Sequence, residues 1–471
     1  MSGSTLMVQG TASSAGKSLL TTALCALAAR RGVKVAPFKA QNMSNNARVV
    51  DGGEIGSAQA LQAWASGITP DVRMNPVLVK PEGDTRSQVV RLGQVDPTLS
   101  RLRWEERAAA LWTDITFSLR SLRDEYDLVI AEGAGSPAEF NLWRWDLANM
   151  RVAEAADAPV LLVSDIDRGG ALAHCYGTWA VLPAAQRARI DAFVLNRFRG
   201  DRALLTPGLD GLRERTGVPV AGVLPWMDHG LPDEDAAGHW EGSDGAGDPV
   251  AIVAYPSISN LDEFTALARA VPVRWARRPA QLADAAMVVL PGAKHVASSI
   301  DWLHATGMAG AITHAAAAGT PVLGVCGGLQ ILGERILDPH GVDATRDGLG
   351  LLPVTTTFAA AKLTARVRTR FTALDGPFAA WSGAAVDGYE IRHGATIATG
   401  PVHQPLPNGR GFARGCVLGV SVHGLLEDPD LLTALFDITT PEPLCTVFDR
   451  LADAVAEHLD PTILDPLLEG P

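Results

Sequence analysis

Short apolar runs alternate with longer alanine- and leucine-rich stretches through the first half of the chain. Runs of strand length occupy residues 6–8, 33–38, 128–131, 160–164, 192–195 and 218–224. A helical pattern follows the first run and extends to about residue 30, and another covers residues 57–65. Strands that alternate with helices predict a parallel sheet covered on both faces. We therefore expect an α/β domain over residues 1–232.

The pattern changes after this domain. Residues 233–249 read DEDAAGHWEGSDGAGDP, a glycine-rich and acidic stretch without periodicity, which we interpret as a linker. A second alternating series follows, with apolar runs at residues 250–254, 287–290, 321–325 and 415–422. It predicts a second α/β domain over residues 250–440. Residues 441–471 are expected to form a helix, over residues 447–459, and a proline-marked tail.

Composition and charge narrow the class of protein. With 471 residues, 47% of them hydrophobic, the chain can build cores for two or three domains, which excludes a disordered tail or a disulfide mini-protein. The net charge of −12 argues against nucleic acid or an anionic membrane as a partner. Five dispersed cysteines without a C-x-x-C spacing fit neither a disulfide framework nor a zinc knuckle, so a reducing compartment is expected.

The chain shows no targeting or membrane-spanning pattern. Its start lacks a basic segment followed by an apolar one, and no stretch approaches about 18 uninterrupted apolar residues. We expect a cytoplasmic protein that does not insert into a membrane. The oligomeric state, a homo-oligomer included, stays open.

A glycine-rich stretch, GTASSAGKS, joins the first predicted strand to the first helix. Backbone N–H groups of such a loop face a bound phosphate, Lys17 adds a cation, and Ser18 offers a hydroxyl to magnesium. Five residues separate Gly10 from Gly16 where the standard motif has four, so an incidental glycine-rich turn is the alternative. The strand before Thr11 and the helix after it favour a phosphate site.

Two acidic residues are candidate magnesium ligands, because magnesium prefers hard oxygen atoms. Glu132 ends a predicted strand and emerges at the carboxyl edge of the sheet, where ligands of such sheets bind. Glu54 lies before the predicted helix at residues 57–65. The alternatives are that Glu132 caps the following turn and that Glu54 interacts only with a helix dipole.

Further polar groups follow other strands of the same sheet. Lys39 follows the second strand and precedes the amide-rich run at residues 41–46, and it would suit a phosphate or substrate contact. Asn196 follows a later strand and would suit the edge of an adenine base. Salt bridges among the acids and arginines of residues 165–170 and 196–201 are the alternative role for this edge.

A second candidate site lies in the C-terminal half. Cys326 stands between a predicted strand and a helix over residues 329–337, flanked by glycines, where a tight turn exposes a nucleophile. The N–H of Gly327 and the loop around Gly292 would supply an oxyanion hole. His423, at the end of a later strand, would supply the base. The alternative for a lone cysteine is a packing role in a core.

Taken together, these stretches resemble the cobyric acid synthase family, glutamine-dependent amidotransferases of cobalamin biosynthesis, over nearly the whole chain. The N-terminal half looks like the dethiobiotin synthetase type of P-loop fold, and the C-terminal half looks like the class I (triad) glutamine amidotransferase fold. The resemblance rests on residues 8–11, 15–18, 37–43, 51–56, 74–78, 132–139, 165–170, 196–201 and 324–328.

The resemblance implies a function for both sites. Cys326 and His423 would release ammonia from glutamine, with Gln330 contacting that substrate. ATP with Mg²⁺ would phosphorylate a carboxylate in the first domain, and ammonia would displace the phosphate. The corrinoid substrate would be adenosylcobyrinic acid a,c-diamide, amidated at its b, d, e and g side chains.

Two alternative functions remain, and the sequence differs from the class I amidotransferase pattern at one position. The sister enzyme that amidates the a and c carboxylates of cobyrinic acid shares this architecture, although the residues at 41–46 and 74–76 favour cobyric acid synthase. A partition-type regulatory ATPase would carry a second lysine early in the P-loop, which this chain lacks. Many class I amidotransferases have an acid two residues after the histidine; here that residue is Leu425, and Glu427 lies two further on.

Overall fold

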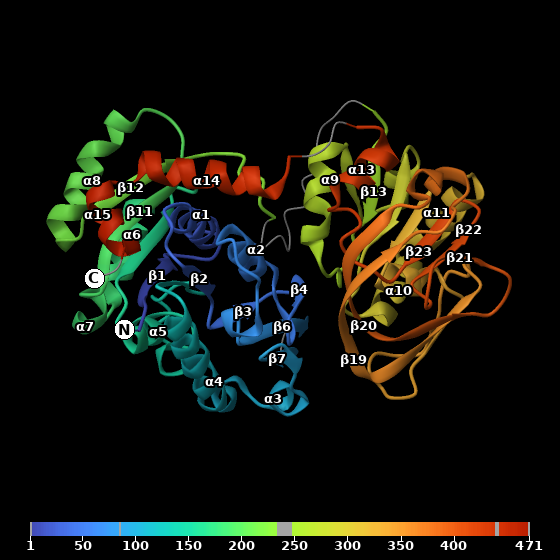
Figure 1. Cartoon of the computed structure of the whole chain (residues 1–471), viewed down its shortest axis with the longest axis horizontal. Coiled ribbons are helices and arrows are strands. Elements are labelled where there is room, and N and C mark those ends of the chain that lie inside the picture. Colours follow the sequence, from blue (N-terminus) through green and yellow to red (C-terminus); the bar gives the residue numbers. More distant parts are fainter. Residues whose placement is uncertain (1, 84–85, 233–246, 439–441, 470–471) are drawn as a thin grey trace. The chain divides into compact units, whose positions relative to one another are not determined.

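The computed structural model describes residues 2–83, 86–232, 247–438 and 442–469 and divides the chain into two units (Figure 1). The first contains residues 1–44, 50–235 and 443–471, and the second contains residues 45–49 and 236–442. Both units have the α/β fold that the sequence predicts. Residues 233–246 of the predicted linker lie outside the described residues.

A six-stranded parallel sheet forms the centre of the first unit. Its order is β12-β11-β10-β1-β9-β2, and each strand overlaps one of the six apolar runs of the N-terminal half. The strands are β1 (Ser4–Gly10), β2 (Val35–Phe38), β9 (Leu128–Glu132), β10 (Val160–Asp165), β11 (Ile190–Phe198) and β12 (Val220–Pro225).

Consecutive residues of β1 point to opposite faces of this sheet, as the two-residue period of a strand requires. Met7 packs in one apolar cluster with α4 (Trp104–Glu125), α5 (Met150–Ala156) and α6 (Ala171–Val181). Leu6 and Val8 pack in another cluster with α1 (Lys17–Arg30). Helices therefore cover both faces, which leaves the carboxyl ends of the strands as the place for a site.

The last two helices, α14 (Leu444–His458) and α15 (Pro461–Glu469), belong to the first unit (Figure 1). Val447, Leu451 and Val455 recur every four residues along α14, and this apolar face is buried in the cluster that contains α1. The C-terminal segment thus completes the cover of the first sheet, although it follows the second domain in sequence.

A small sheet that the apolar runs did not predict lies beside the main sheet of the first unit. It has four strands in the order β3-β6-β7-β8. These strands are β3 (Gln41–Met43), β6 (Val77–Gly83), β7 (Arg86–Arg91) and β8 (Gln94–Val95), and the first unit also contains β5 (Gly53–Gly56). The helix α2 (Ser57–Ala65) follows β5 over the residues that the sequence predicts.

The second unit contains a seven-stranded sheet with the order β14-β13-β15-β16-β23-β22-β21. Its first five strands are parallel, and the last two join in antiparallel pairs. The strands are β13 (Val250–Val253), β14 (Val273–Ala276), β15 (Met287–Leu290), β16 (Val322–Val325), β21 (His403–Leu406), β22 (Gly411–Arg414) and β23 (Val417–Val420).

The helix predicted over residues 329–337 is wrong in its second half. The helix α12 (Gly327–Leu332) ends before Gly333, and β17 (Arg335–Leu337) then pairs with β19 (Val354–Arg370). A side chain at Gly333 would lie 2.9 Å from the Val354 carbonyl oxygen, so the close approach of two backbones ends the helix there. Of the described helices, none is long and apolar enough to cross a membrane.

Candidate functional site

The glycine-rich loop of the first unit runs from the end of β1 to the start of α1. Gly16 has a φ of 104°, and a Cβ at this position would lie 2.0 Å from Nδ2 of Asn196. The same Nδ2 donates a hydrogen bond to the Ala15 carbonyl oxygen at 3.2 Å. Glycine is therefore required where the loop passes Asn196.

The other side-chain atom of Asn196, Oδ1, is buried and accepts no hydrogen bond within the part of the chain that the structure describes. Buried acceptors of this kind are rarely left unsatisfied in proteins. An N–H donor from a ligand, such as the amino group of adenine, would satisfy it. This observation fits the predicted nucleotide contact of Asn196.

Lys17 and Ser18 begin α1 and turn toward β9 and the loop after it. Lys17 Nζ donates to the carbonyl oxygens of Ala12, at 3.0 Å, and Gly135, at 3.1 Å. Ser18 Oγ donates to Glu132 Oε1 at 2.9 Å. The structure thus brings the predicted cation, hydroxyl and strand-end carboxylate to one edge of the sheet.

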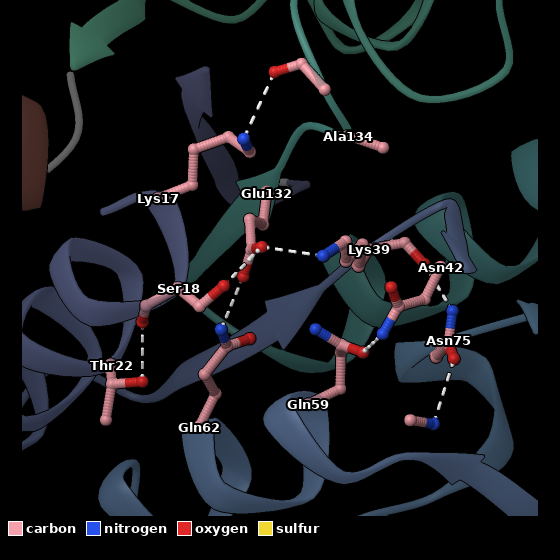
Figure 2. Close-up of polar contacts among 12 residues, drawn as sticks. Lys17, Ser18, Thr22, Lys39, Asn42, Gln59, Gln62, Asn75, Glu132 and Ala134 are labelled. Atoms are coloured by element: carbon pink, nitrogen blue, oxygen red, sulfur yellow. Dashed lines mark hydrogen bonds and ion pairs between the residues drawn. The ribbon is translucent and has the colours of Figure 1, made fainter. Parts of the chain in front are cut away.

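Glu132 is the centre of a buried polar network, which Figure 2 shows. Besides Ser18, its carboxylate accepts from Lys39 Nζ at 2.7 Å and from Gln62 Nε2 at 2.6 Å. A buried carboxylate needs such partners because desolvation of an unpaired charge is costly. Lys39 therefore has a structural role in this network, beside the phosphate loop where a contact was predicted.

Ser18 and Glu132 fit magnesium, since a hydroxyl and a carboxylate 2.9 Å apart are hard oxygen donors next to a phosphate loop. Magnesium usually keeps waters and phosphate oxygens as its other ligands, so two protein donors suffice. Glu54 is engaged differently, because its carboxylate forms a buried ion pair with Lys80 at 2.7 Å. Within the described ranges no cluster of three His, Cys, Asp or Glu side chains suits a metal.

Salt bridges account for several of the other polar residues at this sheet edge. Asp165 pairs with Arg197 at 3.0 Å and with Arg168 at 3.4 Å. Asp167 lies 3.6 Å from Arg199. For these residues the structure supports the alternative role, in which they form salt bridges with one another at the edge of the sheet.

Cys326 lies at the turn between β16 and α12 in the second unit. Its φ of 51° is in the left-handed region, which costs free energy for a residue with a side chain. The flanking glycines make the turn possible: a Cβ at Gly328 would lie 2.0 Å from the Leu290 carbonyl oxygen, and one at Gly327 would lie 2.6 Å from the Ala293 nitrogen. This strained, tightly packed turn is typical of a nucleophile elbow.

His423 is buried and held by a carboxylate that the sequence reasoning missed. Its Nδ1 lies 2.8 Å from Oε2 of Glu263, and Oε1 of the same carboxylate accepts from the Gly424 N–H at 2.9 Å. Glu263 belongs to η3 (Leu261–Phe264) and stands 160 residues before the histidine. No local motif could have identified it, because the sequence around residue 263 carries no recognisable pattern.

The charges around His423 keep its imidazole protonated. Burial by itself lowers the pKa of His423, whereas the Cys326 sulfur and the Glu263 carboxylate raise it, to about 10. His423 thus interacts with both Cys326 and Glu263, as the histidine of a Cys-His-Glu triad does.

The remaining predicted residues of this site surround the triad. Gly292 packs against the histidine, since a Cβ there would lie 2.9 Å from His423 Cε1. Gly327 is the first residue of α12, so its N–H is one of those that a helix leaves without an internal partner. Gln330 Nε2 donates to the His393 carbonyl oxygen at 3.4 Å.

Comparisons with known proteins cover both units. Residues 6–234 match the CobQ/CobB/MinD/ParA nucleotide binding domain, and residues 249–430 match the CobB/CobQ-like glutamine amidotransferase domain. The cobyric acid synthase of Polaromonas sp. is 51% identical, over 99% of this chain and 98% of its own length. That of Paracidovorax citrulli is 54% identical, over 97% of each chain.

The chain belongs to the cobyric acid synthase family. This membership confirms the predicted resemblance and makes the chain a glutamine amidotransferase ligase of cobalamin biosynthesis with a P-loop nucleotide-binding domain. Among solved structures, a glutamine amidotransferase is similar to 43% of this chain, at 16% identity and with a TM-score of only 0.30.

For this member of the cobyric acid synthase family, we expect Glu263→Gln to slow glutamine hydrolysis by roughly 10²-fold. Loss of the anion lowers the pKa of His423 from about 10, so the imidazolium deprotonates at lower pH. The alkaline limit of glutaminase activity should therefore move to lower pH. Glutamate release, measured across pH, checks both effects.

Glu334→Gln is the matched control, because this exposed carboxylate of the same unit accepts only from Thr399 among the hydrogen bonds described. It should leave the rate and the pH profile unchanged. A Glu263→Gln enzyme with the parent's alkaline limit would contradict the triad role of Glu263.

Proposed function

We propose that the chain catalyses the ATP- and glutamine-dependent amidation of the b, d, e and g carboxylates of adenosylcobyrinic acid a,c-diamide, giving adenosylcobyric acid. One observation carries the proposal: a single chain holds a buried Cys326-His423-Glu263 triad and a P-loop in which Ser18 contacts Glu132. The names of the relatives support the choice of corrinoid.

In the glutaminase reaction, the Cys326 thiolate attacks the side-chain amide carbon of glutamine. The carbonyl oxygen becomes an oxyanion, which the N–H of Gly327 and the loop at Gly292 stabilise. Protonated His423 gives its proton to the leaving nitrogen, so ammonia departs and a thioester remains. Neutral His423 then takes a proton from water, whose oxygen displaces the sulfur to give glutamate and restores the thiolate.

In the synthetase reaction, a carboxylate oxygen of the corrinoid attacks the γ-phosphorus of ATP and ADP leaves. A carboxylate accepts ammonia poorly until this oxygen becomes part of a phosphate leaving group. Ammonia then attacks the acyl carbon, loses a proton and displaces phosphate to leave the amide. Lys17 would neutralise phosphate charge, and Asn196 Oδ1 would accept from the adenine amino group.

Magnesium bound at this site would neutralise charge on the nucleotide phosphates. Ser18 and Glu132 are the residues that would hold it. Glu132 would do so in competition with Lys39 and Gln62, which bind its two oxygens in the structure. Glu54 would need to leave Lys80 to take part.

The reaction is tested by incubation of the protein with the a,c-diamide, ATP, Mg²⁺ and glutamine, followed by mass spectrometry of the corrinoid. Each step exchanges a hydroxyl for an amino group, so we expect four successive small losses of mass. Cobyrinic acid is the comparison substrate, and amidation of its a and c carboxylates in preference would favour the sister activity. ATP turnover with both corrinoids unaltered would overturn the proposal.

A further inference from the structure

A short segment from the first half of the sequence is built into the second unit. Residues 45–49 belong to that unit, whereas the residues on either side of them belong to the first. Asn46 Oδ1 accepts from the Leu261 N–H at 2.9 Å, and the Ala47 N–H donates to Asn260 Oδ1 at 3.2 Å. These two hydrogen bonds attach the segment to the start of η3, the turn that carries Glu263.

Arg48 is the charged residue of this segment, and its side chain is buried. One guanidinium nitrogen, Nη2, lies 2.6 Å from Asp262 Oδ2, and a second, Nη1, lies 2.6 Å from Glu427 Oε1. Asp262 directly precedes Glu263, and Glu427 is in the segment that follows His423. A single guanidinium thus joins the two stretches of chain that supply the triad acid and the triad base.

Arg48 also reaches the triad through an aromatic ring. Its guanidinium carbon lies 5.2 Å from the centre of the Tyr389 ring, within the range of a cation–π contact. The Tyr389 ring in turn stacks on the His423 imidazole, with ring centres 5.3 Å apart and an angle of 19° between the planes. Asn260 Nδ2 donates to the Tyr389 hydroxyl at 3.4 Å.

We propose that Arg48 is a positioning residue for the glutaminase reaction, which aligns Glu263 and His423 through Asp262, Glu427 and Tyr389. Without its charge, the buried Asp262 and the partly exposed Glu427 would lie near a third carboxylate, Glu263, with no guanidinium to offset their repulsion. The turn at Asp262 would then shift and carry Glu263 out of line with His423. The match to the amidotransferase domain spans residues 249–430, so this contribution comes from outside it.

This inference rests on the proposed glutaminase function, and the test is carried out on the full chain. Glutamate release measures the glutaminase, and ammonia-driven amidation measures the synthetase. We expect Arg48→Met to lower kcat for glutamine hydrolysis by roughly 10-fold, with KM for glutamine and the ammonia-driven rate unchanged. If the parent itself released no glutamate, the proposed function would fail rather than the role of Arg48.

A double-mutant cycle separates positioning from a general loss of structure. In a Glu263→Gln background, Arg48→Met should have little further effect, because the residue that Arg48 aligns is already disabled. Additive losses would overturn the proposal, as would an equal loss of ammonia-driven activity or an Arg48→Met enzyme as active as the parent.

Two further variants serve as controls for loss of the charge at Arg48 and for loss of an ion pair elsewhere in the same unit. Arg48→Lys keeps the positive charge but not the planar guanidinium that binds two carboxylates, so this variant should fold. Its kcat for glutamine hydrolysis should fall by less than that of Arg48→Met. In a Glu263→Gln background, Arg48→Lys should have no further effect on kcat. A full loss of both activities in this variant would contradict positioning. Arg346→Met, which breaks the paired contacts to Asp301 at 3.0 and 3.1 Å in the same unit, should leave kcat unchanged.

Discussion

The variant Cys326→Ala is expected to lose glutamine-dependent amidation, by roughly 10⁴-fold or more, while it keeps amidation driven by ammonia. The sulfur is the only protein atom that bonds to the amide carbon of glutamine in the proposed reaction, and alanine retains the turn without it. The P-loop of the first unit is untouched and still activates the carboxylate. Rates with glutamine and with a high concentration of ammonium salt, measured on one preparation, check the prediction.

Cys416→Ala is the matched control, because this thiol lies in the same unit and only donates to the Ala316 carbonyl oxygen, at 3.2 Å, in the described structure. Its activities with glutamine and ammonia should equal those of the parent. Loss of both activities in a folded Cys326→Ala protein would contradict the division of labour between the two sites.

The variant Lys17→Ala should lose activity with both nitrogen sources, by roughly 10³-fold or more. Lys17 supplies the mobile cation of the P-loop, and without it the charge that develops during phosphoryl transfer is not offset. No acyl phosphate then forms, so ammonia has no activated carbon to attack. Release of ADP and formation of the amide, both measured with saturating ammonia, check the result.

Lys34→Ala serves as the control for this loss, because the Lys34 ammonium group lies at the exposed surface of the same unit and donates to the Glu125 carbonyl oxygen at 2.6 Å. It should retain both activities. Basal glutamate release should also survive in Lys17→Ala, since the triad belongs to the other unit. Ammonia-driven synthesis at the parent's rate in Lys17→Ala would refute the assignment of the phosphate loop.

Local patterns in the sequence predicted much of this architecture because they arise from local physics. An apolar run of strand length between helical segments has few alternatives to a buried parallel strand, and all six runs of the first half joined one sheet. The glycines around Lys17 and Cys326 predicted both turns, since glycine permits the positive φ angles and close backbone contacts that such turns need. The small β3-β6-β7-β8 sheet was missed because β3 and β8 are very short and the longer β6 and β7 are partly polar.

Other decisions depended on contacts between residues far apart in the chain. The apolar face of α14 could be predicted from its four-residue spacing, but not that it would cover the first sheet rather than the second. Glu54 and Glu132 were both candidate metal ligands from the sequence, and the ion pair of Glu54 with Lys80 became evident only in the folded chain. Lys39 likewise proved to bind Glu132.

By itself, the sequence determined the two α/β domains, the phosphate loop and the nucleophile turn, because each depends on neighbouring residues and on the periods of strands and helices. Only the tertiary structure decided what orients His423, because Glu263 lies 160 residues away and Arg48 still further, in the other half of the chain. A buried charge is paired by whichever residue the fold brings near, and the local sequence carries no record of that choice.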